Sequence, residues 1–381
     1  MIDAPAPIPL AYLRTAPEPT LPAPIFSRGA LAWMRENLFS SWSSSAMTLI
    51  LLALCLWLIP PVVAWATINA IWLAPDGALC RAHQDGACWA FVAQKMDYFR
   101  YGSYPQSERW RVDLTEIVGA VLIVLLLWPR ARRRDIGAGL FFVGFPVLAF
   151  FLLRGSDWLG LPVVDTVLWG GIFVSLLTAL VGIVFSLPLG VLLALGRRSS
   201  LPVVKLASII YIEFVRGVPF ITVLFMANFM LPLFLPENWT PDRLLRPLIG
   251  TVLFAAAYMA EEVRGGLQSI NKGQFEGAMA LGLNFWRMMG LVILPQALTL
   301  VIPGIVNNFI GLFKDTTLVS VVGLLDFLAT VENASKDTVW IGPTIAPTGY
   351  AFAALFYFVF CFAMSRYQAF MERRLAAGRR R

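Results

Sequence analysis

Long apolar segments, separated by short polar ones, occupy most of this chain. Several of the apolar segments have about 18 residues or more, the length that an α-helix needs to cross the hydrocarbon core of a membrane. Backbone polar groups inside lipid must be paired, and a helix pairs its own. We therefore expect an all-α, polytopic transmembrane helical bundle with about eight spans. They cover residues 47–73, 113–129, 136–153, 166–195, 203–235, 247–268, 291–313 and 347–365.

Three segments depart from this pattern. Pro60 and Pro61 fall inside the first span, where they would kink or break the helix. The segment 203–235 is too long for a straight crossing, so we expect a helical part of it to lie along the membrane interface before the crossing. Residues 314–345 are mixed in polarity, which is consistent with a re-entrant or interfacial segment.

Composition indicates the same class of protein. Of the 381 residues, 58% are hydrophobic and only 14% are charged, whereas soluble domains carry roughly a quarter charged residues. The net charge is +7, and the basic residues cluster in short loops beside apolar segments. This is the positive-inside pattern of a protein embedded in membrane lipid, and it argues against nucleic acid as a partner.

The basic clusters also predict an orientation. An even number of spans places both termini on one side, and assigning that side to the cytoplasm puts every basic cluster there. These clusters are Arg130, Arg132, Arg133, Arg134, Arg197, Arg198, Lys272 and the last three arginines.

The spans divide the chain into four regions. Residues 1–46 are a proline-rich cytoplasmic tail, and residues 367–381 are a basic cytoplasmic tail. Residues 47–165 hold three accessory spans with a periplasmic loop at 74–112. Residues 166–366 hold the remaining five spans and all of the motifs described below.

The loop 74–112 contains Cys80 and Cys88, which are separated by seven residues. If the loop is periplasmic, its oxidising surroundings admit a disulfide between them, and this pairing stays open. The single histidine, His83, has no further ligands clustered around it, so we expect no metal site. Aromatic residues are dense in the loop, which is typical either of a membrane-interface belt or of a docking surface for a periplasmic binding protein. They are Trp89, Phe91, Tyr98, Phe99, Tyr101, Tyr104 and Trp110.

A polar-headed segment at 270–290 separates two apolar spans. Gln274 to Leu281 can form a short helix, Gly282 breaks it, and Asn284 or Phe285 starts another. Its apolar residues are abundant for a connector that faces water, which favours either docking of a partner or a helix resting on lipid headgroups. They are Phe275, Met279, Leu281, Leu283, Phe285, Trp286 and Met289.

This segment resembles the EAA loop of bacterial ABC importer permeases, in which E-A-A, three residues, G and nine residues precede I-x-L-P. Glu276, Ala278, Gly282, Leu294 and Pro295 fall in register with that pattern, and Val292 takes the isoleucine place. Gly277 departs from it, because it replaces the first alanine and weakens a helix by roughly 1 kcal/mol.

Three further stretches are similar to motifs of polar-amino-acid permeases. Residues 211–219 resemble Y-x-E-x-x-R-G-x-P, and residues 257–266 resemble the third core span of those proteins. Residues 314–320 resemble K-x-T-S-L-V-S, with Thr317 where serine is usual. Together with the additional residues 1–165, these stretches make the chain similar to the longer permease subunit of general L-amino-acid importers.

The resemblance implies a type I importer core and a division of labour among subunits. The chain would form the translocation path in a bacterial inner membrane, beside a second permease subunit, either a paralogue or a second copy. A cytoplasmic ABC ATPase dimer would use ATP and Mg and grip the EAA loop. A periplasmic amino-acid-binding protein would deliver the substrate. No cofactor is expected on this chain.

Charged residues within or near the spans are candidates for the path or its gate, because ionised groups in lipid usually pair or line a pathway. Glu213 and Arg216, and likewise Glu261 and Arg264, are three residues apart and share a helix face. Structural ion pairs at the cytoplasmic edge, a substrate or gate contact, and contact with the partner permease all remain open for these pairs.

Lys314, Thr316 and Thr317 form a third polar stretch beside an apolar span. They are candidates for the lining of the translocation path, and a solvated outer loop is the alternative for them.

The chain contains no G-x-x-x-x-G-K-[ST] phosphate loop, and it contains no nucleophile motif of a hydrolase. We therefore expect no enzymatic activity on this chain, with ATP hydrolysis on a separate subunit. The alternative function is an ion-coupled secondary amino-acid transporter, in which Glu213, Glu261 or Glu262 would carry the coupling ion.

Overall fold

The computed structural model describes residues 29–128, 134–236 and 241–379, and the chain divides into two units, Met1–Ile68 and Asn69–Arg381. Within the first unit, α1 (Ala30–Asn37) precedes α2 (Trp42–Val63), which continues as a π-helix, η2 (Ala64–Ile68). Most of the expected proline-rich tail, residues 1–28, lies outside the described residues. The remainder of that expected tail holds α1 and the first turn of α2.

The proline pair does not break the first span. Pro60 and Pro61 both lie inside α2, and the amide of Ala64 donates to their two carbonyl oxygens. A proline removes one backbone donor, and here the wider π turn that begins at Ala64 follows directly. The prediction of a break was therefore wrong, since the helix changes its winding and continues to Ile68.

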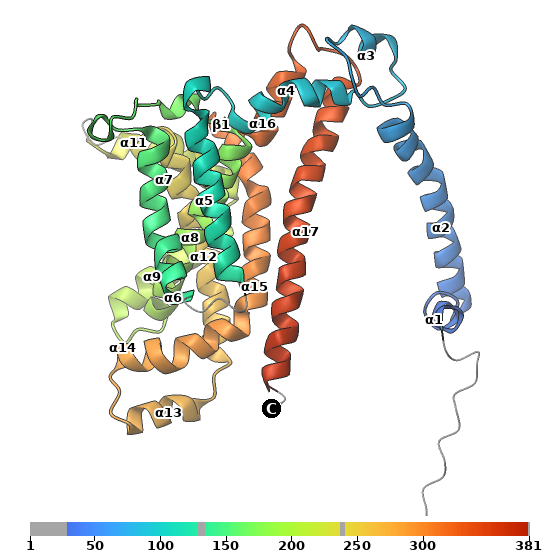
Figure 1. Cartoon of the computed structure of the whole chain (residues 1–381). Coiled ribbons are helices and arrows are strands. Elements are labelled where there is room, and N and C mark those ends of the chain that lie inside the picture. Colours follow the sequence, from blue (N-terminus) through green and yellow to red (C-terminus); the bar gives the residue numbers. More distant parts are fainter. Residues whose placement is uncertain (1–28, 129–133, 237–240, 380–381) are drawn as a thin grey trace, which may run out of the picture. The chain divides into compact units, whose positions relative to one another are not determined.

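The second unit is a helical bundle with one two-residue parallel bridge (Figure 1). Its first half contains α3 (Ala78–Ala82), α4 (Trp89–Tyr101), η3 (Gln106–Glu108), α5 (Arg109–Leu127), α6 (Arg134–Gly139), η4 (Leu140–Gly144), α7 (Phe145–Arg154), η5 (Asp157–Leu159), η6 (Thr166–Leu168), β1 (Gly170–Gly171) and α8 (Ile172–Arg197). Then follow α9 (Pro202–Gly217), α10 (Phe220–Phe225), η7 (Met226–Met230), α11 (Leu231–Phe234), α12 (Leu245–Gln268), α13 (Lys272–Ala280) and α14 (Phe285–Met288). The last elements are η9 (Met289–Ile293), α15 (Leu294–Asp315), η10 (Thr316–Val322), β2 (Leu325–Asp326), α16 (Phe327–Ser335) and α17 (Ile345–Arg379).

Helices occupy the expected span positions. Within the described residues, five helices are long and apolar enough to cross a membrane, and the bent pair α9–α10/α11 makes a sixth. The helices α5 and α12 lie at two more expected positions, although their charged residues keep them outside that criterion. The helix α17 runs to Arg379, so the expected C-terminal tail at 367–381 is largely a continuation of the last span.

The overlong segment 203–235 is interrupted, as its length predicted. The helix α9 ends at Gly217, the next helix begins at Phe220, and the two are bent by 111°. One side of α9 is apolar and exposed, with Val203 and Phe214 at 78% and 59%. This is the pattern expected of a helix that lies along a membrane interface.

The helices α8 and α12 form the centre of the bundle. Small residues permit their close approach: a Cβ at Gly190 would lie 2.4 Å from the Cβ of Met259. Around them, Ala256, Ala257 and Ala260 are fully buried. In lipid, helices associate through close packing of this kind, so this pair positions the elements that carry the motifs.

The segment 74–112 is folded against the end of the bundle that we call the upper end (α3, α4 and α16; Figure 1). A disulfide joins Cys80 and Cys88. Arg81 donates to the Val339 carbonyl at 3.1 Å, and Lys95 hydrogen-bonds to Asp337 and so lowers the pKa of that carboxyl group. These contacts attach the segment to the α16–α17 connection.

The aromatic residues of this segment form part of the core. Phe91 and Phe99 are fully buried beside Phe327, and Tyr104 is 1% exposed. The predictions of an interface belt or a docking surface are therefore wrong for these residues, because α4 packs its aromatic face against α16 and α17. Trp110 remains 48% exposed.

Replacing Cys80 or Cys88 by serine is expected to loosen the segment 74–112. The two cysteines are 8 positions apart, and closing a loop of that size contributes about 2–3 kcal/mol. Trypsin should then cleave after Arg81 roughly 30- to 150-fold faster, as followed by mass spectrometry. Cys55→Ser is the control and should leave the rate unchanged. Equal rates in all variants would contradict the structural role of the bond.

Candidate functional site

The helices α13 and α14 form a helix–turn–helix at the opposite, lower end of the second unit (Figure 1). The side chain of Asn271 caps α13 by accepting a hydrogen bond from Gly273 N at 2.9 Å. Asn284 caps α14 in the same way, through Arg287 N at 2.9 Å. Between the helices, Gly282 has a φ of 74°, in the left-handed region that favours glycine. The structure thus has the helix, the glycine break and the second helix that the sequence predicted.

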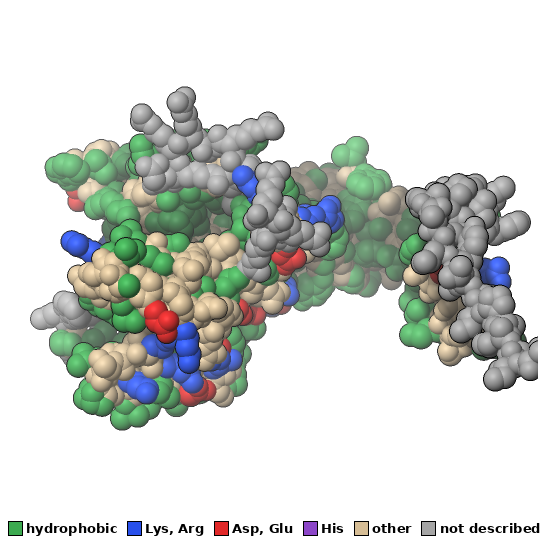
Figure 2. All heavy atoms as spheres, turned by 90° about the horizontal axis from the view of Figure 1, so that it is seen from below, with side chains coloured by type: hydrophobic (Ala, Val, Ile, Leu, Met, Phe, Trp, Pro, Cys, Tyr) green, Lys and Arg blue, Asp and Glu red, His purple; other side chains and the backbone are tan. Residues whose placement is uncertain are grey.

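Large apolar side chains of this segment face outward. Met279 is 57% exposed, Leu281 80% and Trp286 68%, and Glu276 is exposed as well. Figure 2 views the structure from below and shows hydrophobic side chains among basic and acidic ones. Apolar side chains in this number on a polar connector mark a surface that is covered by a partner or by lipid headgroups.

The opposite side of the segment is anchored in a buried apolar cluster. Ala278 is 4% exposed and Ile293 is fully buried. Both belong to a cluster with Leu195 of α8, Ile212 of α9 and Val263 of α12. Force applied to the exposed side is therefore passed to three long helices, since close-packed interiors transmit strain.

Polar contacts add to this anchor. Arg198 donates to the Leu267 carbonyl at 3.2 Å, and its guanidinium lies 5.5 Å from the ring centre of Phe275. On the other side, Gln296 donates to the Gln274 side chain at 3.1 Å. These contacts join α13 to the ends of α8 and α15.

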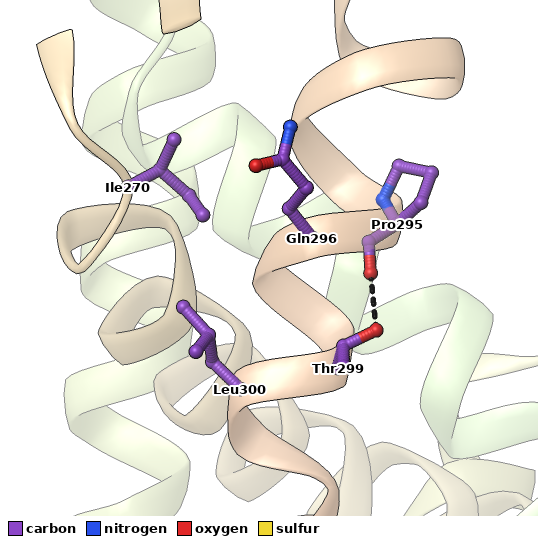
Figure 3. Close-up of a pocket in the computed structure, with 5 residues that line it drawn as sticks. All are labelled: Ile270, Pro295, Gln296, Thr299 and Leu300. Atoms are coloured by element: carbon purple, nitrogen blue, oxygen red, sulfur yellow. Dashed lines mark hydrogen bonds between the residues drawn. The ribbon is translucent and has the colours of Figure 1, made fainter. Parts of the chain in front are cut away.

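A hollow of about 410 Å³ lies between the α12–α13 connection and α15. Figure 3 shows Ile270 on the connection facing Gln296 and Leu300 on α15, while Thr299 donates to the Pro295 carbonyl at 2.7 Å. The predicted motif residue Pro295 thus lines a recess whose residue Gln296 is bonded to Gln274 of α13. Leu294 instead packs onto the buried cluster.

A network of charges connects α8, α9 and α12 above this segment. The Glu261 carboxylate bonds to Arg264 at 2.9 Å and lies 3.7 Å from both Arg197 and Arg216. Arg197 also bonds to Glu213 at 2.8 Å. One carboxylate is therefore shared by three arginines from three helices, which fixes the helices relative to one another.

One of the two predicted ion pairs is formed and the other is not. Glu261 and Arg264 bond within α12 as expected. Glu213 and Arg216 do not bond to each other, because Glu213 reaches α8 and Arg216 reaches α12. Residues three apart on one helix face can form an ion pair, but Glu213 instead bonds to Arg197 of the neighbouring helix α8.

Glu262 connects α12 to α15. Its Oε1 accepts a hydrogen bond from Asn308 at 3.2 Å, and a Cβ at Gly304 would lie 2.1 Å from its Oε2. The sequence alone indicated only the role of an ion carrier for this residue. The signal in the sequence was Gly304, one turn before Asn308, because its missing side chain leaves room for the Glu262 carboxylate.

The stretch Lys314–Ser320 lies at the upper end, at the close of α15 and in η10. Thr316 is 1% exposed and donates to the Phe313 carbonyl, whereas Lys314 is exposed. Thr317 is half-buried and donates to the Lys314 carbonyl at 2.9 Å. Both hydroxyl groups thus bond to backbone carbonyls at the junction of α15 and η10. That these residues line the translocation path remains a prediction.

Comparison with known proteins identifies the family. The model of the binding-protein-dependent transport system inner membrane component matches residues 186–377, which include α13 and α14. The chain belongs to this family. The permease is 47% identical to the inner membrane amino-acid ABC transporter permease protein YhdY of Escherichia coli (strain K12), over 95% of this chain and 97% of that protein.

The chain is also similar to a second transport permease and to a solved amino-acid transporter. The glutamate/glutamine/aspartate/asparagine transport system permease protein BztC of Rhodobacter capsulatus is 37% identical to the permease, over 97% of this chain and 99% of that protein. Among solved structures, the crystal structure of an amino acid ABC transporter with histidines is 28% identical and covers 54% of this chain and 92% of that chain, with a TM-score of 0.46.

Replacing Gly277 by alanine is expected to stabilise α13. An added Cβ would meet nothing within 4 Å, so the helix should gain about 1 kcal/mol. Gly282→Ala is the matched variant, because its Cβ is equally free but its φ of 74° makes alanine cost about 1–2 kcal/mol. Hydrogen exchange of the α13 amides should slow in the first variant and accelerate in the second. The same direction of change in both would contradict this account.

Glu261→Gln is expected to destabilise the permease more than Glu213→Gln. The first change leaves three arginines without their shared carboxylate, while the second removes one contact of a group that is 55% exposed. The expected loss is about 1–2 kcal/mol for Glu261→Gln and under about 1 kcal/mol for Glu213→Gln. Thermal unfolding in detergent measures both, and equal losses would show that the arginines do not depend on Glu261.

Proposed function

We propose that this permease imports amino acids as the transmembrane subunit of an ATP-driven, binding-protein-dependent transporter, and that α13 and α14 are its contact with a separate ATPase. The observation that carries the proposal is the exposed apolar set Met279, Leu281 and Trp286 on a rigidly anchored helix–turn–helix. Amino acids as cargo are supported by the relatives YhdY and BztC, which match over nearly the whole chain.

Two features of α13 and α14 favour a protein partner over lipid headgroups. Their apolar side chains project from a turn whose ends are fixed by two asparagine caps, and such a preorganised surface is typical of specific docking. The recess at Pro295 adds a concave surface of about 410 Å³ beside them. Projecting apolar side chains together with a concave surface fit a folded protein partner better than a fluid lipid surface.

Movement of the ATPase would reach the path through the buried cluster. Ala278 and Ile293 pack on α8, α9 and α12, and the shared carboxylate of Glu261 keeps the ends of these helices together. A displacement of α13 therefore moves three helices as one body. This is a rigid-body switch between two arrangements, in which the contacts at one end bias the other.

The remaining partners follow from the two ends of the molecule. The disulfide at the upper end favours the periplasm, where such bonds persist, so the lower end faces the cytoplasm and the ATPase dimer, which uses ATP and Mg. A periplasmic binding protein would then meet the upper end, and a second permease subunit would complete the path. Both termini would lie in the cytoplasm of a bacterial inner membrane.

The alternative of an ion-coupled transporter is less well supported. A coupling carboxylate has to exchange its ion during transport. Glu261 is bonded to or lies near three arginines, and Glu213 is bonded to Arg197, so each carboxylate already has a counter-charge in the protein. Glu262 is bonded to Asn308 across two helices.

Leu281→Asp is expected to release the ATPase, since it places a charge in the centre of the proposed contact. Retention of the ATPase on the purified permease should fall roughly tenfold or more, with ATP-dependent amino-acid uptake by proteoliposomes falling in parallel. Glu276→Ala and Gly282→Ala should release the ATPase or uncouple its hydrolysis from uptake.

Ile341→Asp is the matched control, because Ile341 is 53% exposed at the upper end. It should retain the ATPase fully. Uptake that continues without any ATPase subunit, or that a proton uncoupler abolishes at constant ATP, would refute the proposed function.

A further inference from the structure

A second hollow lies at the upper end, away from α13 and α14. Its volume is about 380 Å³, within the range of small-molecule sites. It is formed where the start of α12 meets η7 and the end of η10, and it is lined among others by Asn228, Arg243, Arg246, Val321 and Gly323. The motif stretch that begins at Lys314 therefore leads into this hollow.

The hollow carries two positive charges that no carboxylate of the described residues neutralises. Arg246 is held by backbone carbonyls only, those of Pro241 at 2.8 Å and Asn228 at 3.3 Å. Arg243 forms no ion pair in the described part of the chain. The neighbouring Asp242 is directed elsewhere, since it accepts hydrogen bonds from Thr166 and from the Leu244 amide. The two guanidinium groups are thus available to an anion.

Asn228 adds an unpaired acceptor to the same hollow. Its residue is 5% exposed, and its amide nitrogen donates to the Val322 carbonyl at 3.3 Å. This bond directs the amide nitrogen, and the Oδ1 atom is buried without a hydrogen-bond partner. Buried acceptors are normally paired, so a ligand with an N–H donor would complete this one.

The shape of the hollow depends on Gly323. Its φ is 84°, in the left-handed region, and it ends η10. A Cβ at this position would lie 2.7 Å from an Nη atom of Arg243. Glycine therefore both closes the 3-10 turn and leaves room for the guanidinium.

We propose that this hollow binds the amino acid that the permease transports, with a carboxylate on Arg243 and Arg246 and the ammonium group donating to Asn228 Oδ1. Two guanidinium groups that no carboxylate of the described residues neutralises select amino acids with a second carboxylate over neutral ones, because hydrogen bonds between two ions are the stronger ones. The inference rests on the proposed function and specifies its substrate class.

Equilibrium binding of radiolabelled L-glutamate to the purified transporter complex, without binding protein or ATP, tests this site. The wild-type complex should bind it saturably and prefer it to L-glutamine. Arg246→Gln should weaken binding roughly 10- to 100-fold, and Arg243→Gln should remove the preference over L-glutamine. Arg246→Lys, which keeps the charge, should bind with intermediate affinity.

Arg154→Gln is the matched control, an exposed arginine at the upper end whose guanidinium contacts Phe150, and it should bind as wild type does. Equal affinity of the wild type and Arg246→Gln would overturn the proposal. Absence of saturable L-glutamate binding by a complex that still performs ATP-driven amino-acid uptake would overturn it and leave the proposed function intact. A third outcome also overturns the proposal: Arg246→Gln binds L-glutamate as wild type does but no longer retains the binding protein. In that case the arginines would bind a carboxylate of the binding protein.

Discussion

The close approach of α8 and α12 is the constraint on which the rest of the structure depends. Lipid supplies no hydrophobic driving force between helices, so small residues and dense contact have to hold them together. At Gly190 any side chain would collide with Met259, and the approach is therefore possible only with glycine. It brings Arg197, at the end of α8, to 3.7 Å from Glu261 of α12, and it forms the buried surface onto which α13 is anchored.

The part of the site that could be predicted from the sequence is the part that local chemistry decides. The α13–α14 turn needs a residue with positive φ and two caps, and Gly282, Asn271 and Asn284 supply them within a few positions. No distant contact is required to choose this conformation. The interruption of the long segment before Phe220 was predictable for a similar reason, because its length alone excluded a straight crossing.

The errors concern choices that depend on tertiary packing. Spacing allowed Glu213 and Arg216 to pair on one helix, but the pairing of each is decided by α8 and α12, whose distance the sequence does not reveal. Phe91 and Phe99 have the composition of an interface belt, yet they lie in a core made with α16 and α17. An aromatic residue is equally favourable in either place, so its type could not distinguish them.

The helix α12 connects the two ends of the molecule. It holds Arg246 of the upper hollow in its first turn and Glu261 of the charge network 15 residues later, a separation of about 22 Å at 1.5 Å per residue. Its interior contains no proline after Pro247 in its first turn, and it packs closely on α8 at Gly190. Glu261 and Arg246 therefore lie on one continuous helix, which contacts both the buried cluster beneath α13 and the upper hollow. If α13 and α14 contact the ATPase and the upper hollow binds the substrate, as proposed, then a single helix connects the two sites.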